Sequence, residues 1–384
     1  MNRMKRQDYS SSVFFALVRA GFWEQGVRLA SYETIDFDAL YELADEQSVV
    51  GLIAAGLEHV EDRKVVKKDA LPFLKKVVGL ESRNASMNVS IGEIISRMRE
   101  VGIYAILVKG QGVAQCYARP QWRSSGDIDL FLDDENYKKA KAFLTPLASH
   151  IDREDSSRLH LGMTLDPWAV ELHGTMRTGI SSRVDGVIDA VQGDIFLNGG
   201  VRVWHNDDVD IFLPNPDNDA IIVFTHFIHH FYVGGIGLRQ ICDWCRLLWT
   251  YRDSIDRALL ERRLEEMRLT AEWKVFAAFA IEWLGMPEGA MPFYSSDARI
   301  RRKASRVCNL ILETGNFGHN KDSSYRTRYS RLVGNVITFW RRLGEFARRS
   351  TIFPRNAGSF FVKYVFDRIR AVCHFSIIDH RSFF

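Results

Sequence analysis

The sequence RSSGDIDLFLDD, residues 123–134, places two aspartates, Asp127 and Asp129, at the start of an apolar run. Alternate residues of a strand point to the same face. The pattern therefore predicts a strand with both carboxylates side by side and with Ile128 and Leu130 turned towards the core. Burying charge is costly unless it is compensated. The compensating groups that we expect are basic side chains or metal ions.

A second feature stands just upstream of this strand. The run LVKGQG, residues 107–112, predicts a strand that enters a glycine turn at Gly110 and then a helix. This arrangement exposes backbone N–H groups that can bind phosphate. Lys109 and Arg123 add positive charge nearby, which makes them candidates for holding a triphosphate. Ordinary salt bridges at the surface are the alternative interpretation of both residues.

The third acidic candidate lies in VELH, residues 170–173. In a strand, Glu171 and His173 share one face, while Val170 and Leu172 face the core. If this strand lies near the first, Glu171 completes a cluster of three carboxylates. Such a cluster favours a hard divalent cation with oxygen ligands. His173 either contacts phosphate, orients a substrate or hydrogen-bonds to the cluster.

The order of the sequence patterns predicts an α+β fold with helices at both ends. We divide the chain into an N-terminal helical region (1–102), a compact α+β core (103–214), a second helical domain (215–298) and a basic, aromatic-rich helical segment (299–384). Asp133 and Asp134 are expected to cap the helix that follows the first acidic strand.

Charge is distributed unevenly along the 384 residues, whose formal net charge is +3. Residues 299–384 hold 18 Lys and Arg against 5 Asp and Glu, which leaves the rest of the chain at −10. This segment interleaves arginine with aromatics, a pattern typical of nucleic-acid surfaces and of membrane-surface helices. The interpretation that we prefer is packing against the helical half, because Phe361, Val365 and Ile369 recur at the spacing of one helix face.

Five scattered cysteines argue against a disulfide framework and for a reducing compartment. We predict no signal peptide and no membrane-spanning stretch, and we expect a cytoplasmic protein. Cys242 and Cys245 have redox spacing, but their helical context favours core cysteines. Nearby, His226, His229 and His230 favour a packed helix over a metal site.

The motifs resemble those of the bacterial uncharacterised nucleotidyltransferases, a family of the superfamily that includes DNA polymerase beta and kanamycin nucleotidyltransferase. The resemblance covers roughly residues 36–260, and its motifs occur in the family's order as LVKG, CYARPQWR, GDIDLFL, VELHG and GIGLRQICDW. It implies a polymerase-beta-like catalytic core with a mixed β-sheet in residues 103–214. It also implies a substrate- or nucleotide-binding role for residues 215–298.

Two departures from the superfamily pattern concern the nucleotide. The turn is Lys109-Gly110-Gln111 instead of Gly-Ser, so a serine contact to phosphate is missing. The spacer between Gly110 and Asp127 is also longer than usual. Both departures indicate that nucleotide placement differs in detail.

The resemblance implies a magnesium-dependent nucleotidyltransferase. An acceptor hydroxyl would attack the α-phosphate of a nucleoside triphosphate such as ATP and release pyrophosphate. Asp127, Asp129 and Glu171 would be catalytic and would hold two Mg²⁺ ions, with Mn²⁺ as an alternative. The residues assigned to nucleotide binding are Lys109, Gly110, Arg123, Ser124, His173, Arg239 and Asp243.

Several alternatives stay open. Arg239 and Asp243 are four residues apart on a predicted helix, so a plain intrahelical salt bridge also explains them. The acceptor is a small molecule, a sugar, a protein or RNA. The chain could instead be a catalytically silent nucleotide-binding or scaffold module, although retention of all three acids argues against this. It could also bind nucleic acid through residues 299–384.

Overall fold

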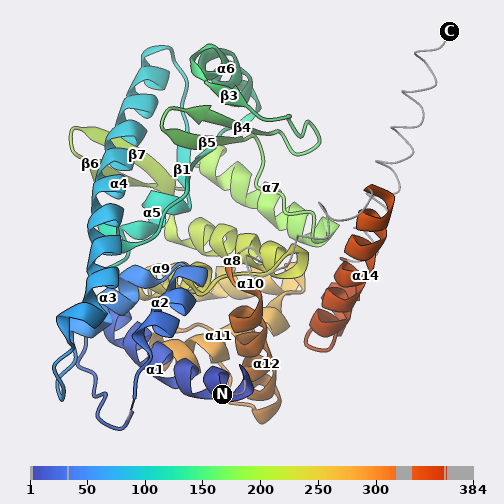
Figure 1. Cartoon of the computed structure of the whole chain (residues 1–384). Helices are drawn as coiled ribbons and strands as arrows, with labels where there is room; N and C mark the ends of the chain where they lie inside the picture. The colour runs from blue at the N-terminus through green and yellow to red at the C-terminus, as the bar shows by residue number, and fades with distance from the viewer. Residues whose placement is uncertain (1–2, 33, 317–330, 359, 361–384) are drawn as a thin grey trace.

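The computed structural model describes residues 3–32, 34–316, 331–358 and 360. Its elements follow the predicted order of helices, a sheet with short helices, and helices again (Figure 1). Near the N-terminus, α2 (Phe37–Glu46) and α3 (Val50–Glu58) are separated at Gln47 and Ser48. Ser48 has a φ of 58°, which interrupts the helical path.

A mixed sheet of five strands forms the α+β core in the described part of the chain. Its order is β1-β2-β5-β4-β3. Strands β2 and β5 are parallel, and the other neighbours in the sheet are antiparallel. The predicted α+β class with a mixed sheet is therefore confirmed. The strands are β1 (Ile106–Val108), β2 (Asp127–Phe131), β3 (His150–Ile151), β4 (His160–Leu165) and β5 (Trp168–His173), with a separate hairpin of β6 (Val201–Asn206) and β7 (Val209–Pro214).

The parallel pairing of β2 with β5 decides where the acidic side chains lie. Asp129 is directly opposite Glu171 across this pair, and Asp127 is two residues earlier on β2. Because strand side chains alternate between faces, all three carboxylates lie on one face of the sheet. Ile128 and Leu130 lie on the other face and are buried, as the sequence pattern predicts.

Helices surround the sheet on both faces (Figure 1). The long α4 (Lys67–Glu100) is followed by Gly102, whose φ of +72° suits the predicted end of a helix. Asp133 caps α6 by accepting a hydrogen bond from the Asn136 backbone N–H. The other described helices are α1 (Arg3–Trp23), α5 (Gly110–Ala114), α6 (Asp134–Leu144), α7 (Ser182–Leu197), α8 (Pro216–Val233), α9 (Leu238–Thr250), α10 (Arg257–Met267), α11 (Thr270–Leu284), α12 (Ala298–Thr314) and α14 (Arg331–Ser350), with 3₁₀ turns at Pro120–Trp122, Thr145–Leu147 and Glu288–Ala290.

The sheet separates two hydrophobic clusters. The face with Ile128 and Leu130 packs with α6 and with the C-terminal half of α4. On the carboxylate face, Phe131 joins a larger cluster to which α1, α8, α9, α11 and α12 contribute. Trp244 and Trp273 are fully buried in this cluster. The carboxylates therefore face the helical body of the protein.

The basic segment is described only in part. Helix α12 packs against α11, and Arg301 pairs with Glu282 of α11. These contacts fit the packing interpretation for α12. The predicted helix face of Phe361, Val365 and Ile369 lies outside the described residues. Among the helices that the structure describes, none combines the length and apolar character needed to cross a bilayer.

Candidate active site

Three carboxylates meet on the face of the sheet that is turned towards the helices. One oxygen from each of Asp127, Asp129 and Glu171 lies within 4.8 Å of the others. The Asp129 side chain is 4% exposed, whereas that of Glu171 is 33% exposed. The structure thus brings together the three acids that the sequence suggested, with one of them buried and another open to solvent.

The turn after β1 brings Lys109 onto this cluster. Lys109 has φ 58° and ψ −143°, and Gly110 has φ 38°, so the chain turns sharply where α5 begins. Lys109 Nζ lies 2.7 Å from Asp129 Oδ1. Helix α5 has only 5 residues, and so short a helix has a weak dipole. The lysine ammonium is therefore the main positive charge that the turn supplies.

Two histidines also contact the carboxylates. His173 Nε2 lies 2.8 Å from Asp129 Oδ1, and His160 Nε2 lies 3.2 Å from Glu171 Oε2. His160 was not singled out in the sequence. Counting back from the hairpin turn at residues 166–167 would have found it, because His160 is directly opposite His173 in the β4–β5 pair.

The buried charge of Asp129 is compensated by its neighbours. Burial favours the neutral carboxyl, but the Lys109 ammonium and the hydrogen bond to His173 outweigh it and lower the pKa of Asp129. Burial favours the neutral amine of Lys109, but the negative charge of Asp129 outweighs this effect and raises the pKa of Lys109. Hydrogen bonds to carboxylates also outweigh burial at His173 and raise its pKa. The group is thus a compact network of opposite charges.

The other two carboxylates differ from each other. The hydrogen bond to His160 and the close contact with His173 lower the pKa of Glu171. The negative charge of Asp129, together with burial, raises the pKa of Asp127 instead. The Asp127 side chain makes no hydrogen bond or ion pair with another described residue. Three carboxylate oxygens, one of them from a side chain without a direct partner among the described residues, are a donor set that fits a divalent metal ion.

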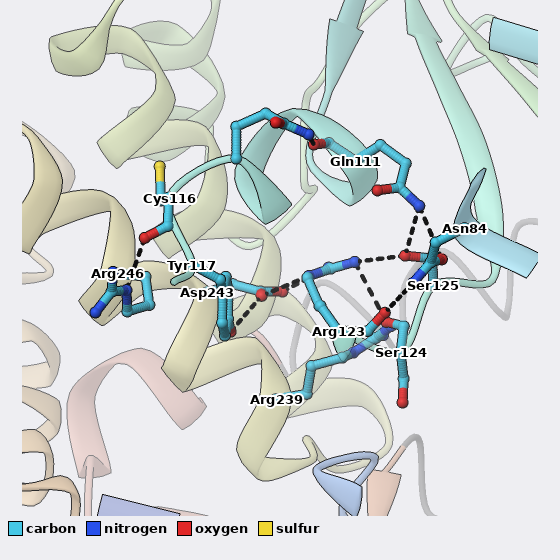
Figure 2. Close-up of polar contacts among 11 residues, drawn as sticks. Asn84, Gln111, Cys116, Tyr117, Arg123, Ser124, Ser125, Arg239, Asp243 and Arg246 are labelled. Atoms are coloured by element: carbon cyan, nitrogen blue, oxygen red, sulfur yellow. Dashed lines mark hydrogen bonds and ion pairs between the residues drawn. The ribbon is translucent and has the colours of Figure 1, made fainter. Parts of the chain in front are cut away.

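Arg123 is held in a buried ion pair. Its Nε and one Nη donate to the two carboxylate oxygens of Asp243, each at 2.7 Å, and the other Nη donates to the Ser124 carbonyl and to Ser125 Oγ (Figure 2). The Tyr117 hydroxyl donates to the same carboxylate at 2.8 Å. The side chains of the pair are 4% and 9% exposed. The alternative of an ordinary surface salt bridge is therefore wrong for Arg123.

Arg239 does not form the plain intrahelical salt bridge with Asp243, so that alternative is also wrong. One Nη of Arg239 donates to the Ser124 carbonyl at 2.6 Å (Figure 2). Its Nε is buried and has no hydrogen-bond partner among the described residues. Burial and the nearby charge of Arg123 lower the pKa of Arg239. Arg239 is thus a cation with unused hydrogen-bonding capacity.

Gln111, the residue that follows the glycine turn, supports the segment that leads into β2. Its Nε2 donates to Asn84 Oδ1 at 2.9 Å and to Ser125 Oγ at 3.2 Å. Asn84 in turn donates to the carbonyls of Gln121 and Arg123, both at 2.7 Å. Figure 2 shows this network beside the Arg123 ion pair. The residue in place of the superfamily serine therefore bonds to the Asn84 and Ser125 side chains, and Asn84 in turn anchors the backbone before β2.

A cavity of about 190 Å³ lies between the sheet and helices α8 and α9. Two predicted residues are absent from its lining. Ser124 contributes its carbonyl to the arginine contacts, and His173 contacts Asp129, which does line the cavity. The predicted residues that line the cavity are Lys109, Gly110, Arg123, Asp127, Asp129, Glu171, Arg239 and Asp243.

Two histidines of this cavity were expected only to pack within their helix. His226 and His230 of α8 line it beside Phe227 and Gln240, and the two imidazole rings are 4.5 Å apart. Burial lowers the pKa of His226 and brings that of His230 to about 4. Both are therefore neutral at pH 7. Helix α8 is buried on nearly all sides, so its sequence pattern marks no single face as the cavity wall.

Cys242 and Cys245 are buried in the core, as their helical context predicts. Both cysteines are free and fully buried on α9. Burial raises the pKa of both thiols well above the ordinary value, which makes them poor nucleophiles. They are core residues of the helix that carries Arg239 and Asp243.

Comparison with known proteins assigns the family. The model of a family described as uncharacterised nucleotidyltransferases matches residues 33–285, which contain every strand and cavity residue described above. Neither the curated proteins nor the solved structures contain a match to the chain. The match extends beyond residue 260, where the resemblance in the sequence was expected to end, and includes α10 and α11. Because it covers well over half of the chain, this protein belongs to the uncharacterised nucleotidyltransferase family.

Proposed function

We propose that the protein transfers a nucleoside monophosphate from a nucleoside triphosphate to an acceptor hydroxyl and releases pyrophosphate. The observation that carries this proposal is the register of β2 and β5, which places Asp127, Asp129 and Glu171 within 4.8 Å of one another beside the cavity. Membership of the nucleotidyltransferase family supports the same reaction class.

Asp127, Asp129 and Glu171 would hold the divalent metal, for which Mg²⁺ is our first choice because all three donors are carboxylate oxygens. When bound, two such ions neutralise the phosphates and lower the pKa of the attacking hydroxyl. Asp127 supports this assignment most clearly, because it is the carboxylate without a described partner and its pKa is raised by Asp129.

In the proposed reaction, the acceptor oxygen forms a bond to the α-phosphorus while the bond from that phosphorus to pyrophosphate breaks. The hydroxyl proton needs an acceptor. Glu171 suits this role because its two histidine contacts keep it ionised and its side chain is 33% exposed. The acceptor molecule would then approach from the Glu171 side of the cavity.

The positive charge for the triphosphate would come from Lys109 and Arg239, which line the cavity. Arg239 is the better placed of the two, because Lys109 already pairs with Asp129 and Arg239 Nε has no partner in the described part of the chain. We assign Arg123, which is fully engaged by Asp243, to positioning the segment that precedes β2.

Two further proposals concern the whole chain. We retain the division at residues 102, 214 and 298 as a proposal about function, although the helical regions on both sides of the core share one hydrophobic cluster. The four described cysteines are free and buried, which supports a reducing compartment such as the cytoplasm.

The test is incubation of the full chain with each α-labelled nucleoside triphosphate, Mg²⁺ and a cell extract that supplies acceptors. The expected result is a labelled product that requires the wild-type chain and is absent with Asp127→Asn. The matched control is Asp208→Asn, which alters an exposed aspartate in the turn between β6 and β7 and should keep the product. Label transfer that survives Asp127→Asn would refute the proposal.

A further inference from the structure

The carboxylate cluster borders a second group of side chains with different chemistry. His160, Glu171 and His173 each offer one ligand atom, and these atoms also lie within 4.8 Å of one another. His160 is opposite His173 in the β4–β5 hairpin, and Glu171 is two residues before His173 on β5. The sheet therefore fixes two imidazoles and one carboxylate on a single face.

The distances within this group are longer than those of strong charge-assisted hydrogen bonds and match the spacing of ligands around one metal ion. Glu171 Oε2 lies 3.2 Å from His160 Nε2 and 3.4 Å from His173 Nε2. Charge-assisted N–H···O bonds are shorter, about 2.7–2.9 Å, as in the 2.8 Å contact of His173 with Asp129. Ligands that lie about 2.0–2.1 Å from a tetrahedral zinc ion are about 3.3 Å apart.

The single proton on His173 Nε2 strengthens this argument. That atom faces Asp129 Oδ1 at 2.8 Å and Glu171 Oε2 at 3.4 Å. One N–H can point well at only one of them, and the shorter contact goes to Asp129. An ion bound at Nε2 would take the place of that proton and would also be bound by Glu171 Oε2. Asp129 Oδ1 would be the nearest further oxygen donor.

We propose that His160, Glu171 and His173 form a binding site for a transition-metal ion such as Zn²⁺. Imidazole nitrogen favours Zn²⁺ and its neighbours in the first transition row, whereas Mg²⁺ prefers ligand sets made only of oxygen. The site is accessible to solvent, since the His160 side chain is 37% exposed. It differs from the all-oxygen cluster in its two imidazole ligands but has Glu171 in common with it, and Asp129 Oδ1 lies beside both groups.

Shared ligation has a functional consequence. A zinc ion between the histidines would draw Glu171 away from the all-oxygen cluster, so occupation of one site would weaken the other. Zn²⁺ at the histidine site would therefore inhibit the proposed transfer. This consequence rests on the proposed function, whereas zinc binding itself does not.

The test is calorimetric titration of Zn²⁺ into the metal-free full chain, with visible absorption of Co²⁺ as a second probe of coordination by nitrogen. Wild type should bind Zn²⁺, and His160→Gln should weaken that binding by about 100-fold or more, since even changes outside the ligand shell cost 10–100-fold. The matched control is His150→Gln on β3, because His150 Nε2 also lies 3.2 Å from a carboxylate oxygen, Asp152 Oδ1, but belongs to no described group of three ligands.

The proposal is overturned if His160→Gln and His150→Gln bind Zn²⁺ equally well, or if the Co²⁺ spectrum is the same in both. His160→Asn serves as a second variant, and circular dichroism verifies that each variant is folded. Inhibition of pyrophosphate release by Zn²⁺, relieved in His160→Gln, tests the shared use of Glu171. A chain that binds Zn²⁺ through His160 but shows no turnover would refute the proposed function and leave the zinc site standing.

Discussion

Replacing Arg123 by alanine tests whether this residue is an anchor of the fold or a ligand of the triphosphate. The change leaves the Asp243 carboxylate, whose side chain is 9% exposed, without its bidentate partner. Removing one partner of a buried ion pair costs about 3–5 kcal/mol. We therefore expect Arg123→Ala to lower the free energy of unfolding by about 3–5 kcal/mol.

An exposed pair of the same kind provides the matched control. Arg177 makes a bidentate contact with Asp189, but these side chains are 53% and 41% exposed. Exposed pairs contribute about 0–1 kcal/mol, so Arg177→Ala should change stability by no more than that. Urea denaturation of wild type and both variants measures the difference, with Mg²⁺ and nucleotide absent.

The double variant Arg123→Ala/Asp243→Ala completes the cycle. Because it leaves no unpaired buried charge, it should lose less stability than the sum of the two single changes. Arg123→Lys should not restore wild-type stability, because an ammonium group cannot make the bidentate contact. The reasoning is refuted if Arg123→Ala is no more destabilising than Arg177→Ala.

Four further changes test the site itself. Asp127→Asn should raise the melting temperature of the metal-free protein, because its charge is repelled by a neighbouring carboxylate; an unchanged or lower melting temperature would contradict this. Glu171→Gln should reduce turnover at saturating Mg-nucleotide by about 100-fold, the lower range for a general base, with little loss of nucleotide binding by calorimetry. Lys109→Ala should weaken triphosphate binding by about 10-fold and monophosphate binding less; equal effects on both ligands would exclude a contact with the outer phosphates. His226 and His230 have lowered pKa values, so the unfolded chain binds protons that the folded protein does not, and stability should fall by about 1.4 kcal/mol per pH unit for each histidine as the pH drops below about 6.5. In urea denaturation across this range, His230→Asn should show a smaller slope than wild type, and an unchanged slope would exclude its contribution.

The sequence predicted the part of the site that depends on local patterns. The alternation in β2 and β5 places Asp127, Asp129 and Glu171 on the correct face, because strand periodicity is set by neighbouring residues. The glycine turn after β1 was also predicted, since a glycine turn carries a local conformational signal.

The remaining parts depend on contacts between distant segments. The partner of Arg123 is Asp243, 120 residues away on α9, and no local pattern identifies that pair. His226 and His230 could not be assigned to the cavity because α8 is apolar and buried around most of its circumference. His160, in contrast, could have been found from the sequence. Its position opposite His173 follows from the register of the β4–β5 hairpin, which is set by the turn at residues 166–167.

Pyrophosphate release from Mg-nucleoside triphosphate by the full chain, compared between wild type, Asp129→Asn and Asp208→Asn, tests the central claim most directly. Asp129 is the buried carboxylate that contacts Lys109 and His173 and lies opposite Glu171. With an acceptor-containing extract present, we expect release by wild type and Asp208→Asn, and a loss of at least 100-fold in Asp129→Asn, as for removal of a group that stabilises transition-state charge. Release by Asp129→Asn at close to the wild-type rate, with its fold intact by circular dichroism, would contradict the account.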